Sequence, residues 1–379
     1  MTRQRFLATA AGSLAGAGLL SACGADPASR TDAGEGSLAG PPVQWRLASS
    51  YPPSLDILHG GAERLAERVR ILTGGRFDIR VYPAGELVPG LQVMDAVEAG
   101  TVHAGFTAGY FYIGKHPALA FDTAVPFGLT PRQRFAWLHH AGGTDLLREV
   151  YADFGIIHFP FGTTGPQMGG WFRRPLASLA DLRGLRMRIP GLAGEILSRL
   201  GVSVQVLAGG DIFPALERGA IDATEWVGPY DDEKLGFYQI APYYYQPGWW
   251  EPGATTTLQV GRRAWDDLPR AYREALGSAV REVSSDMLAR YDVANPRALE
   301  RLVGEHGVEL RSFPDAILEA AWDESEALLE EQSAADATFR RIHESWSAFR
   351  RTAFRYSAGN ELEYARFAFQ AAGLSAIRP

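Results

Sequence analysis

The sequence predicts an α/β protein whose two lobes close around a ligand like a clamshell. Three observations carry this prediction. Strand-like and helical segments alternate over residues 43–107, and the same rhythm returns over residues 155–227. From Val43 onward the chain is about 337 residues long, which is enough for two separate hydrophobic cores.

The first block predicts a βαβαβ unit. Its strands show alternating polar and apolar residues, and its first helix ends at Gly74 and Gly75, a typical C-terminal signal. Such a unit forms a parallel sheet that binds ligands near the carboxyl ends of its strands. In chain order the predicted elements are strand 43–48, helix 55–72, strand 77–82, helix 90–98 and strand 104–107.

The second block repeats this rhythm, and the chain after it becomes mostly helical. We expect strands over 155–161, 168–172, 185–189, 202–206 and 223–227, with helices over 191–200 and 211–218. A further strand over 255–260 is expected to cross back to the first lobe. The tail predicts amphipathic helices over 297–305, 315–332 and 335–356, with a strand-like segment over 308–313.

These elements predict how the two lobes divide the chain. Residues 43–164 and 254–290 form the first lobe, and residues 165–253 and 291–379 form the second, which includes the C-terminal helices. Because the chain passes between the lobes more than once, we expect hinge strands about which the clamshell closes.

The N-terminus predicts export. Arg3 and Arg5 precede a short apolar run over residues 6–20, as in a signal peptide. The sequence Leu20-Ser21-Ala22-Cys23 resembles a bacterial lipoprotein signal, in which Cys23 becomes the lipidated first residue. Residues 24–42 are rich in Gly, Ala, Ser and Pro and predict a flexible tether after Cys23. We therefore expect a periplasmic protein tethered to a membrane, with an ordinary signal peptide and an incidental cysteine as the alternative.

The charge balance excludes several classes of protein. The formal net charge is −7, and removal of residues 1–22 takes away two arginines and no acidic residue, giving −9. An acidic chain with no basic run does not favour nucleic acid as a partner. The chain contains no Gly-Lys-Ser/Thr phosphate loop, no Gly-x-Ser-x-Gly motif, and no histidine pair at zinc-ligand spacing.

Residues 225–253 hold the densest chemical signal. Glu225 and Glu251 each adjoin a tryptophan, and the same span contains three tryptophans and five tyrosines. Aromatic walls around a few charges suit a closed pocket for a small polar ligand. Three interpretations of the two glutamates remain open at this point: the acid and base of a glycosidase, ligands of a hard cation, or partners of surface arginines.

Three further residues are candidates for the same pocket. Arg188 lies at the end of the predicted strand 185–189, where its planar guanidinium can pair with a carboxylate. Gln167 offers an amide oxygen just before a predicted strand. Tyr110 follows the predicted strand 104–107 in the first lobe and can close the pocket from the opposite side.

At these residues the chain resembles the substrate-binding proteins of tripartite ATP-independent periplasmic (TRAP) transporters. The resemblance rests on residues 186–191, 219–226 and 97–104, on the strand–helix opening at Val43 and on the helical tail. It implies a periplasmic-binding-protein-like fold. Residues 225–230, 243–245 and 247–253 are more specific and resemble the subgroup that binds 2-oxo or small hydroxy acids together with a cation.

The resemblance implies a role for each matching position. Arg188 falls where the family binds the ligand's carboxylate, and Tyr110 falls where a first-lobe tyrosine reaches the ligand. Gln167, Glu225, the backbone carbonyl of Trp226, and Glu251 fall where the subgroup holds sodium or calcium. Gln167 and Trp226 are thereby expected to contact the ligand as well as the cation.

We therefore expect a receptor that is not an enzyme and that delivers a small monocarboxylate, such as pyruvate or lactate, to a membrane permease. Two alternatives remain: a secreted glycosidase that uses Glu225 and Glu251, and a receptor for neutral sugars in which Trp249 and Trp250 stack on the ring. The apolar positions of the helical tail either pack on its own lobes or are shared across a homodimer.

Overall fold

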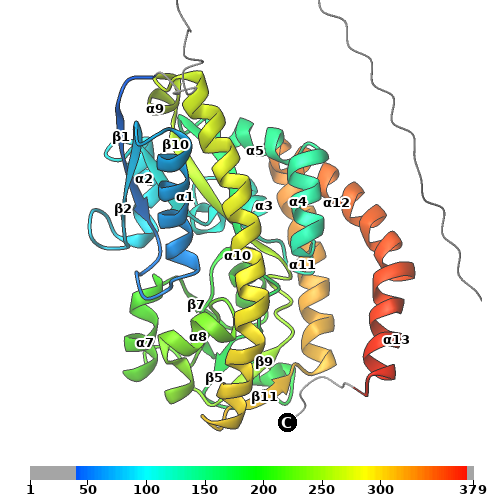
Figure 1. Ribbon diagram of the computed structural model, residues 1–379. Coiled ribbons are helices and arrows are strands. Elements are labelled where there is room, and N and C mark those ends of the chain that lie inside the picture. The colour runs from blue at the N-terminus through cyan, green and yellow to red at the C-terminus, as the bar shows by residue number, and fades with distance from the viewer. Residues whose placement is uncertain (1–39, 374–379) are drawn as a thin grey trace, which may run out of the picture. The chain divides into compact units, whose positions relative to one another are not determined.

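The structure is a computed structural model that describes residues 40–373, all within the unit Leu38–Pro379. The predicted signal segment, Cys23 and nearly all of the tether lie outside the described residues. Within 40–373 the strands form one sheet of five strands and one of six (Figure 1). We call the elements around the five-stranded sheet lobe I and those around the six-stranded sheet lobe II, and the prediction of a two-lobed α/β fold is confirmed.

The sheet of lobe I has the order β2-β1-β3-β10-β4. The first three of these strands run parallel, as the βαβαβ pattern predicts. The strand β10, which is not part of that βαβαβ unit, runs antiparallel to β3 and β4 because it re-enters lobe I from lobe II in the opposite direction. The strands are β1 (Val43–Ser49), β2 (Phe77–Tyr82), β3 (Ala104–Thr107), β4 (Ile156–Gly165) and β10 (Ala254–Gly261).

The sheet of lobe II has the order β11-β9-β5-β8-β6-β7. β6 runs parallel to β7 and β8, whereas β5 runs antiparallel to β8 and β9. The strands are short, and β9 falls in the tyrosine run that the sequence analysis did not assign to a strand. They are β5 (Trp171–Phe172), β6 (Arg186–Arg188), β7 (Ser203–Gln205), β8 (Ala223–Thr224), β9 (Tyr243–Gln246) and β11 (Glu309–Ser312).

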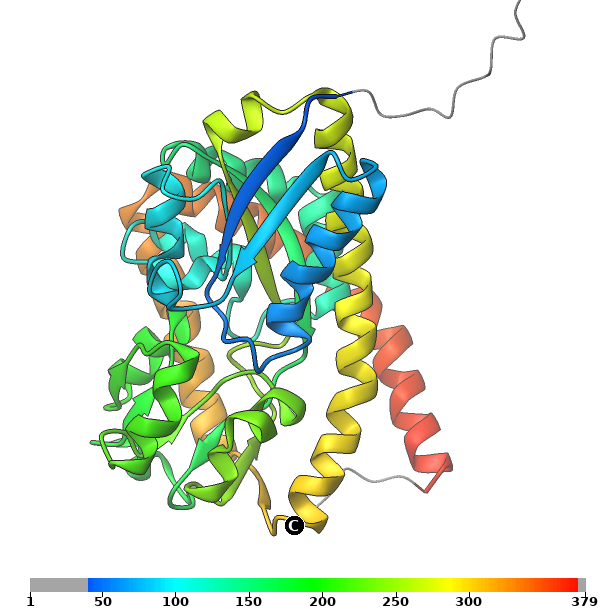
Figure 2. The ribbon, with the colours of Figure 1, turned by 60° about the vertical axis from the view of Figure 1, so that its left-hand side comes forward.

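Helices cover both sheets, and α1 and α10 lie side by side along lobe I (Figure 1, Figure 2). The helices of the described residues are α1 (Leu58–Leu72), α2 (Val93–Glu98), α3 (Ala120–Thr123), α4 (Pro131–His140), α5 (Gly143–Ala152), α6 (Gly191–Arg199), α7 (Gly209–Glu217), α8 (Pro229–Leu235), α9 (Arg262–Asp266), α10 (Arg270–Gly304), α11 (Asp315–Ala335), α12 (Ala337–Ser357) and α13 (Glu363–Ala371). Across residues 40–373, no helix combines the length and apolar character needed to span a membrane.

The helix α10 connects the two lobes. It is a single helix of 35 residues that contacts α1 and β4 in lobe I and α8 in lobe II. Figure 2 shows it passing from the upper group of strands to the lower one. Pro296 lies inside it, although a proline usually ends a helix at the preceding residue. The sequence pattern accordingly predicts a helix start at residue 297, where the structure has a continuous helix.

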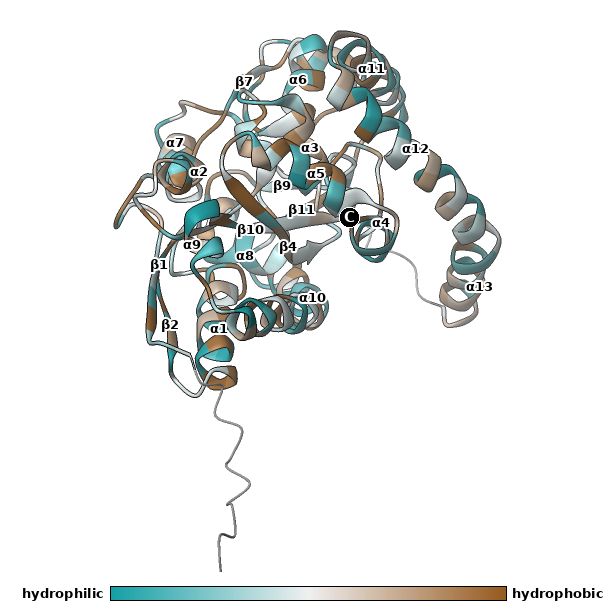
Figure 3. Ribbon diagram, turned by 90° about the horizontal axis from the view of Figure 1, so that it is seen from above, coloured by the Kyte–Doolittle hydropathy of each residue, from teal (hydrophilic) through white to brown (hydrophobic). Residues whose placement is uncertain are grey.

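The C-terminal helices return across both lobes. α11 packs on α6 of lobe II, and α12 packs on α4 and α5 of lobe I. A π-helical turn, Ala358–Leu362, then leads into α13, whose described residues project away from the lobes (Figure 1, Figure 3). Several large apolar side chains on this last segment are exposed: Tyr356, Leu362, Tyr364, Phe367 and Phe369.

Candidate functional site

Four predicted site residues, Tyr110, Gln167, Trp226 and Glu251, line a cavity between the two lobes. Arg188 and Glu225 are fully buried beside it, with Arg188 against the Trp226 ring, and are not among its lining residues. From lobe I the cavity is lined by Tyr51, which follows β1, and by Tyr110, which follows β3. From lobe II it is lined by Gln167, Trp226 and Glu251. The lobe I residues therefore lie at the carboxyl ends of parallel strands, where the strand order predicts ligand binding.

Arg188 and Glu225 lie together at the edge of the lobe II sheet. Arg188 is the last residue of β6, Glu225 directly follows β8, and these strands run parallel with Arg188 opposite Thr224. Equivalent ends of parallel strands meet at one edge of a sheet, which explains why residues 37 positions apart are in contact. Both side chains are completely buried.

Two of the three guanidinium nitrogens of Arg188 make hydrogen bonds. Its Nη1 donates to a carboxylate oxygen of Glu225 and, at 3.2 Å, to the Glu225 carbonyl. Its Nε donates to the Leu207 carbonyl at 3.1 Å, and the group lies 5.1 Å from the Trp226 ring. Its Nη2 is buried with no hydrogen-bond partner in the described residues. An arginine with a free buried donor suits a carboxylate ligand, because an unmet buried donor is costly.

The two glutamates are both buried and electrostatically strained. Burial raises the pKa of Glu225 to about 7 against the opposing effect of Arg188. The pKa of Glu251 is raised well above its usual range by burial and then by the charge of Glu225, while Arg188 and a hydrogen bond from Tyr110 offset part of this. Two such carboxylates require a proton or a cation between them, since neither is solvated.

The oxygen atoms of the pocket fit a hard cation. Gln167 donates from Nε2 to the Thr164 hydroxyl at 3.0 Å, which leaves its Oε1 as the inward-facing acceptor. That Oε1, one carboxylate oxygen of Glu225 and one of Glu251 are all buried without a hydrogen-bond partner in the described residues. Sodium and calcium take such carboxylate and amide oxygens.

The donor set is low in charge for a metal site. Residues 40–373 contain no group of three or more His, Cys, Asp or Glu side chains arranged as metal ligands. The pocket has two carboxylates, so its remaining donors are neutral oxygens such as Gln167 Oε1. This composition suits a cation that the site holds together with an anionic ligand rather than alone.

The aromatic residues divide into two groups. Trp226 and Tyr110 line the cavity. Trp249 and Trp250 do not: Trp249 stacks on Phe127 at 5.0 Å between ring centroids, and Trp250 packs edge-on against Phe313 at 5.5 Å. The expectation that all three tryptophans wall the pocket is therefore wrong for Trp249 and Trp250, whose rings are taken up by the packing of the loop before β10.

Sequence reasoning missed Tyr51 and Thr164. Tyr51 lines the cavity and meets the Trp226 ring edge-on at 6.4 Å, while Thr164 orients Gln167. Both were detectable in principle, because each closely follows or ends a strand of lobe I. The rule that ligands bind at the carboxyl ends of parallel strands points to Tyr51 as directly as it points to Tyr110.

Two α/β lobes that enclose a buried arginine and unpartnered oxygens define a solute receptor. The comparisons with known proteins agree: the family model for bacterial extracellular solute-binding protein, family 7, matches residues 48–336. The chain belongs to this family, and it is an extracytoplasmic solute receptor of the TRAP type.

Three relatives extend this result. A monocarboxylate 2-oxoacid-binding periplasmic protein of Nostoc sp. is 50% identical over 97% of this chain and 99% of its own length. A TRAP solute-binding protein of Bordetella bronchiseptica, crystallised as a mixed-occupancy dimer with copurified calcium and picolinate, is 46% identical with a TM-score of 0.87, covering 88% of this chain and 99% of that one. A Pseudoalteromonas atlantica protein with bound sodium and pyruvate is 36% identical with a TM-score of 0.84, covering 86% and 99%. The Bordetella and Pseudoalteromonas structures contain calcium and sodium respectively, the two cations that the family resemblance implies.

Proposed function

We propose that this receptor binds a small 2-oxo or 2-hydroxy monocarboxylate, such as pyruvate or lactate, together with a sodium or calcium ion, and delivers it to a TRAP permease in the membrane. The observation that carries the proposal is that Arg188 Nη2 and one oxygen each of Gln167, Glu225 and Glu251 are buried without a hydrogen-bond partner in the described residues, at or beside one cavity. The first group needs an anion and the others need a cation. A bound 2-oxo acid with a metal ion meets both needs.

Each site residue has a separate task in this proposal. Arg188 binds the ligand's carboxylate, and Tyr110 reaches the ligand from lobe I. Gln167, Glu225, the Trp226 carbonyl and Glu251 would hold the cation, with Gln167 and Trp226 also touching the ligand. A bound cation supplies positive charge that offsets the two carboxylates and attracts the anionic ligand. Closure of the lobes excludes water, which strengthens each ionic contact.

Arg188→Ala tests the assignment. We expect calorimetric binding of pyruvate in calcium or sodium buffer to be lost, because removing a buried arginine–carboxylate contact costs about 2–5 kcal/mol. That cost is about 30-fold to several-thousandfold in affinity. Arg186→Ala is the matched control, since Arg186 lies on the same strand but pairs with Asp222 at the surface. Undiminished pyruvate binding by the Arg188 variant overturns the proposal.

We also propose that the protein catalyses no reaction. One carboxylate oxygen of Glu225 is paired with Arg188, which disfavours Glu225 as the acid or base of a glycosidase. The covered rings of Trp249 and Trp250 likewise disfavour sugar stacking. Hydrolysis of chromogenic glycosides, or binding of neutral sugars that survives Arg188→Ala, would support these alternatives instead.

The protein is further proposed to form a homodimer through its last helices. Several apolar residues of α13 are exposed, among them Tyr364 and Phe367 at 74% exposure each. A second copy of the chain would cover them, and the Bordetella relative is a dimer. Sedimentation velocity should show a dimer that dissociates when the chain is truncated after Ser357.

The remaining proposals concern location and hinges. A lipid anchor at Cys23 would tether the receptor to the periplasmic face of a membrane. Mass spectrometry of wild type and Cys23→Ser tests it through the mass of the attached acyl chains. We place the lobe boundaries at 164/165 and 253/254, at the end of β4 and the start of β10, and at 290/291, inside α10.

A further inference from the structure

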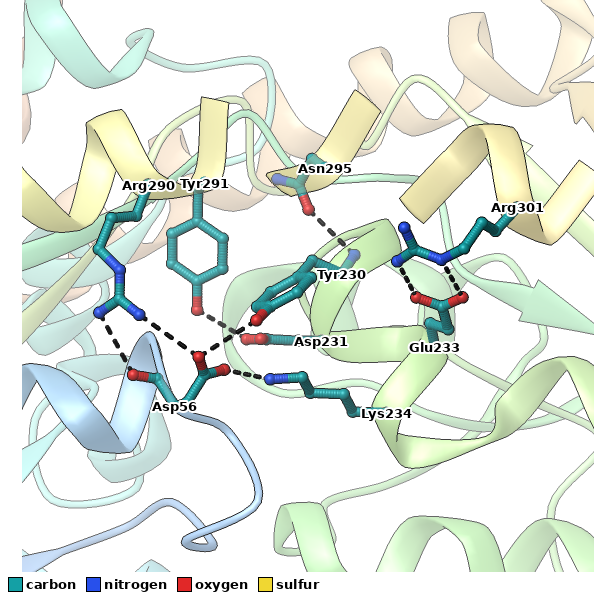
Figure 4. Close-up of polar contacts among 9 residues, drawn as sticks. All are labelled: Asp56, Tyr230, Asp231, Glu233, Lys234, Arg290, Tyr291, Asn295 and Arg301. Atoms are coloured by element: carbon teal, nitrogen blue, oxygen red, sulfur yellow. Dashed lines mark hydrogen bonds and ion pairs between the residues drawn. The ribbon is translucent and has the colours of Figure 1, made fainter. Parts of the chain in front are cut away.

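A cluster of charged residues joins the two lobes beside α8, away from the cavity. Asp56 lies in the lobe I turn before α1, and its carboxylate accepts from Lys234 Nζ and, at 3.1 Å, from the Tyr230 hydroxyl. Both donors belong to α8 of lobe II. Arg290 of α10 completes the cluster, with Nη2 3.3 Å from Asp56 Oδ2 (Figure 4).

This contact has a distinct place among the ion pairs of the protein. Within residues 40–373, Asp56–Lys234 is the one salt bridge that joins a residue in 43–164 to a residue in 165–253. Three other salt bridges, His116–Asp336, Arg132–Glu361 and Arg341–Glu149, join residues in 43–164 to the C-terminal segment 336–361, which packs on lobe I through α12. A change in the angle between the lobes therefore makes or breaks this particular contact.

The lobe II side of the contact is rigid. Tyr291 of α10 donates to Asp231 at 2.6 Å, and Asn295 accepts from the Tyr230 backbone at 3.1 Å (Figure 4). A third pair, Arg301 with Glu233, joins the same two helices. These contacts hold α8 on α10, so the contact with Asp56 positions α8 as a whole and not one side chain alone.

The helix α8 also continues directly from the ligand site. Trp226 lines the cavity, and α8 begins three residues later at Pro229. Asp232 of α8 accepts from the Val227 backbone at 3.2 Å, while the Met168 backbone donates to the Val227 carbonyl at 3.2 Å. The position of α8 is thus coupled to the segments that carry Trp226 and Gln167.

We propose that Asp56 is a closure latch: a positioning residue that touches no ligand but holds lobe I against α8 and so slows release of the enclosed solute. The proposal rests on the proposed function for its ligand and adds a residue that acts on the rate of opening. Because the contact forms only when the lobes meet, its loss should change dissociation far more than association.

The charge state of Asp56 supports this role. Burial works to raise the pKa of Asp56, but the hydrogen bond and charge of Lys234 outweigh it and hold the pKa below its usual value. The carboxylate is therefore charged at neutral pH. Its side chain is 49% exposed and that of Lys234 is 27% exposed, so salt screens the latch and its effect is moderate.

Stopped-flow measurement of pyruvate dissociation in calcium buffer tests the latch. We expect Asp56→Asn to raise the dissociation rate constant about threefold to tenfold, the range for a partly exposed network of two cations on one carboxylate. The association rate constant should stay within about twofold of wild type. Raising the salt concentration should narrow the difference between the two proteins. Lys234→Gln should reproduce the effect without touching Asp56.

Asp95→Asn is the matched control. Asp95 is also 49% exposed and pairs with a lysine, Lys115, that is 29% exposed, but both lie within lobe I. The latch is overturned when Asp56→Asn, folded by circular dichroism, releases pyruvate no faster than Asp95→Asn. If wild type binds no pyruvate with either cation, the proposed function fails separately. The latch is then judged by small-angle scattering of the ligand-free proteins, where equal radii of gyration for the two variants overturn it.

Discussion

At the scale of single residues, the pocket contains buried carboxylates at positions where apolar side chains would make the folded protein more stable. Glu251 is 3% exposed, has an unpartnered oxygen and sits beside a second buried carboxylate. A buried charge of this kind lowers the stability of the ligand-free protein, because the free-energy cost of removing it from water is offset only when an opposite charge lies close by. Residues kept for binding commonly lower stability in this way.

Glu251→Gln should separate these two effects. Glutamine has the same size as glutamate and still offers one oxygen, that of its amide, but it carries no charge. Pyruvate affinity in calcium buffer should therefore fall at least about tenfold. The free energy of unfolding of the ligand-free variant, from urea titration, should be no lower than that of wild type. Glu309→Gln, at an exposed strand position, is the control. A variant that loses stability and keeps its affinity would assign Glu251 a structural role.

At the scale of elements, α8 carries an unusual concentration of buried acid. Asp231 and Asp232 are adjacent and almost completely buried. Burial raises the pKa of Asp231 to about 7 and that of Asp232 to about 6, although the hydroxyls of Tyr291 and Tyr244 oppose the shift. The helix that joins the ligand segment to the latch is therefore sensitive to pH.

The sign of this sensitivity follows from the direction of the shift. A carboxyl whose pKa is higher in the folded state binds its proton more tightly when the protein is folded. Its contribution to the free energy of unfolding is therefore full below about pH 4 and is lost as the pH rises towards 7. Asp231→Asn should flatten that fall by at most about 4 kcal/mol. Urea unfolding of the ligand-free protein between pH 5 and 8 measures it, with Asp315→Asn at the exposed start of α11 as control. Parallel pH profiles for wild type and Asp231→Asn would contradict the assignment.

At the scale of the whole molecule, the sequence predicted elements well where local patterns decide them. The predicted strands over 77–82 and 104–107 coincide with β2 and β3, because alternation and flanking glycines are local signals. α10 was harder, since only tertiary packing on α1 and α8 explains a helix that continues through Pro296. β10 was placed in lobe I correctly, but its antiparallel direction depends on where the chain re-enters.

The candidate site likewise divides into residues that the sequence predicted and residues whose place depends on tertiary packing. Arg188, Gln167, Glu225 and Glu251 were selected from residue type and resemblance, and the fold places them together. Trp249 and Trp250 lie close to a glutamate in the sequence, as Trp226 does. Only the folded structure shows that their rings pack on Phe127 and Phe313 and do not line the cavity. Asp56 carried no sequence signal, because its partner Lys234 is 178 positions away and lies in the other lobe.

Ligand binding should stabilise the molecule as one unit because residues of both lobes line the cavity. At a pyruvate concentration 100 times the dissociation constant, the free energy of unfolding should rise by about 2.7 kcal/mol, which is several degrees in Tm for a chain of this size. The shift should shrink in sodium-free buffer with a chelator and vanish in Arg188→Ala. Differential scanning calorimetry of the three samples measures it. A shift that is equal with and without cations would show that the ligand's carboxylate is held by Arg188 without help from Glu225 and Glu251.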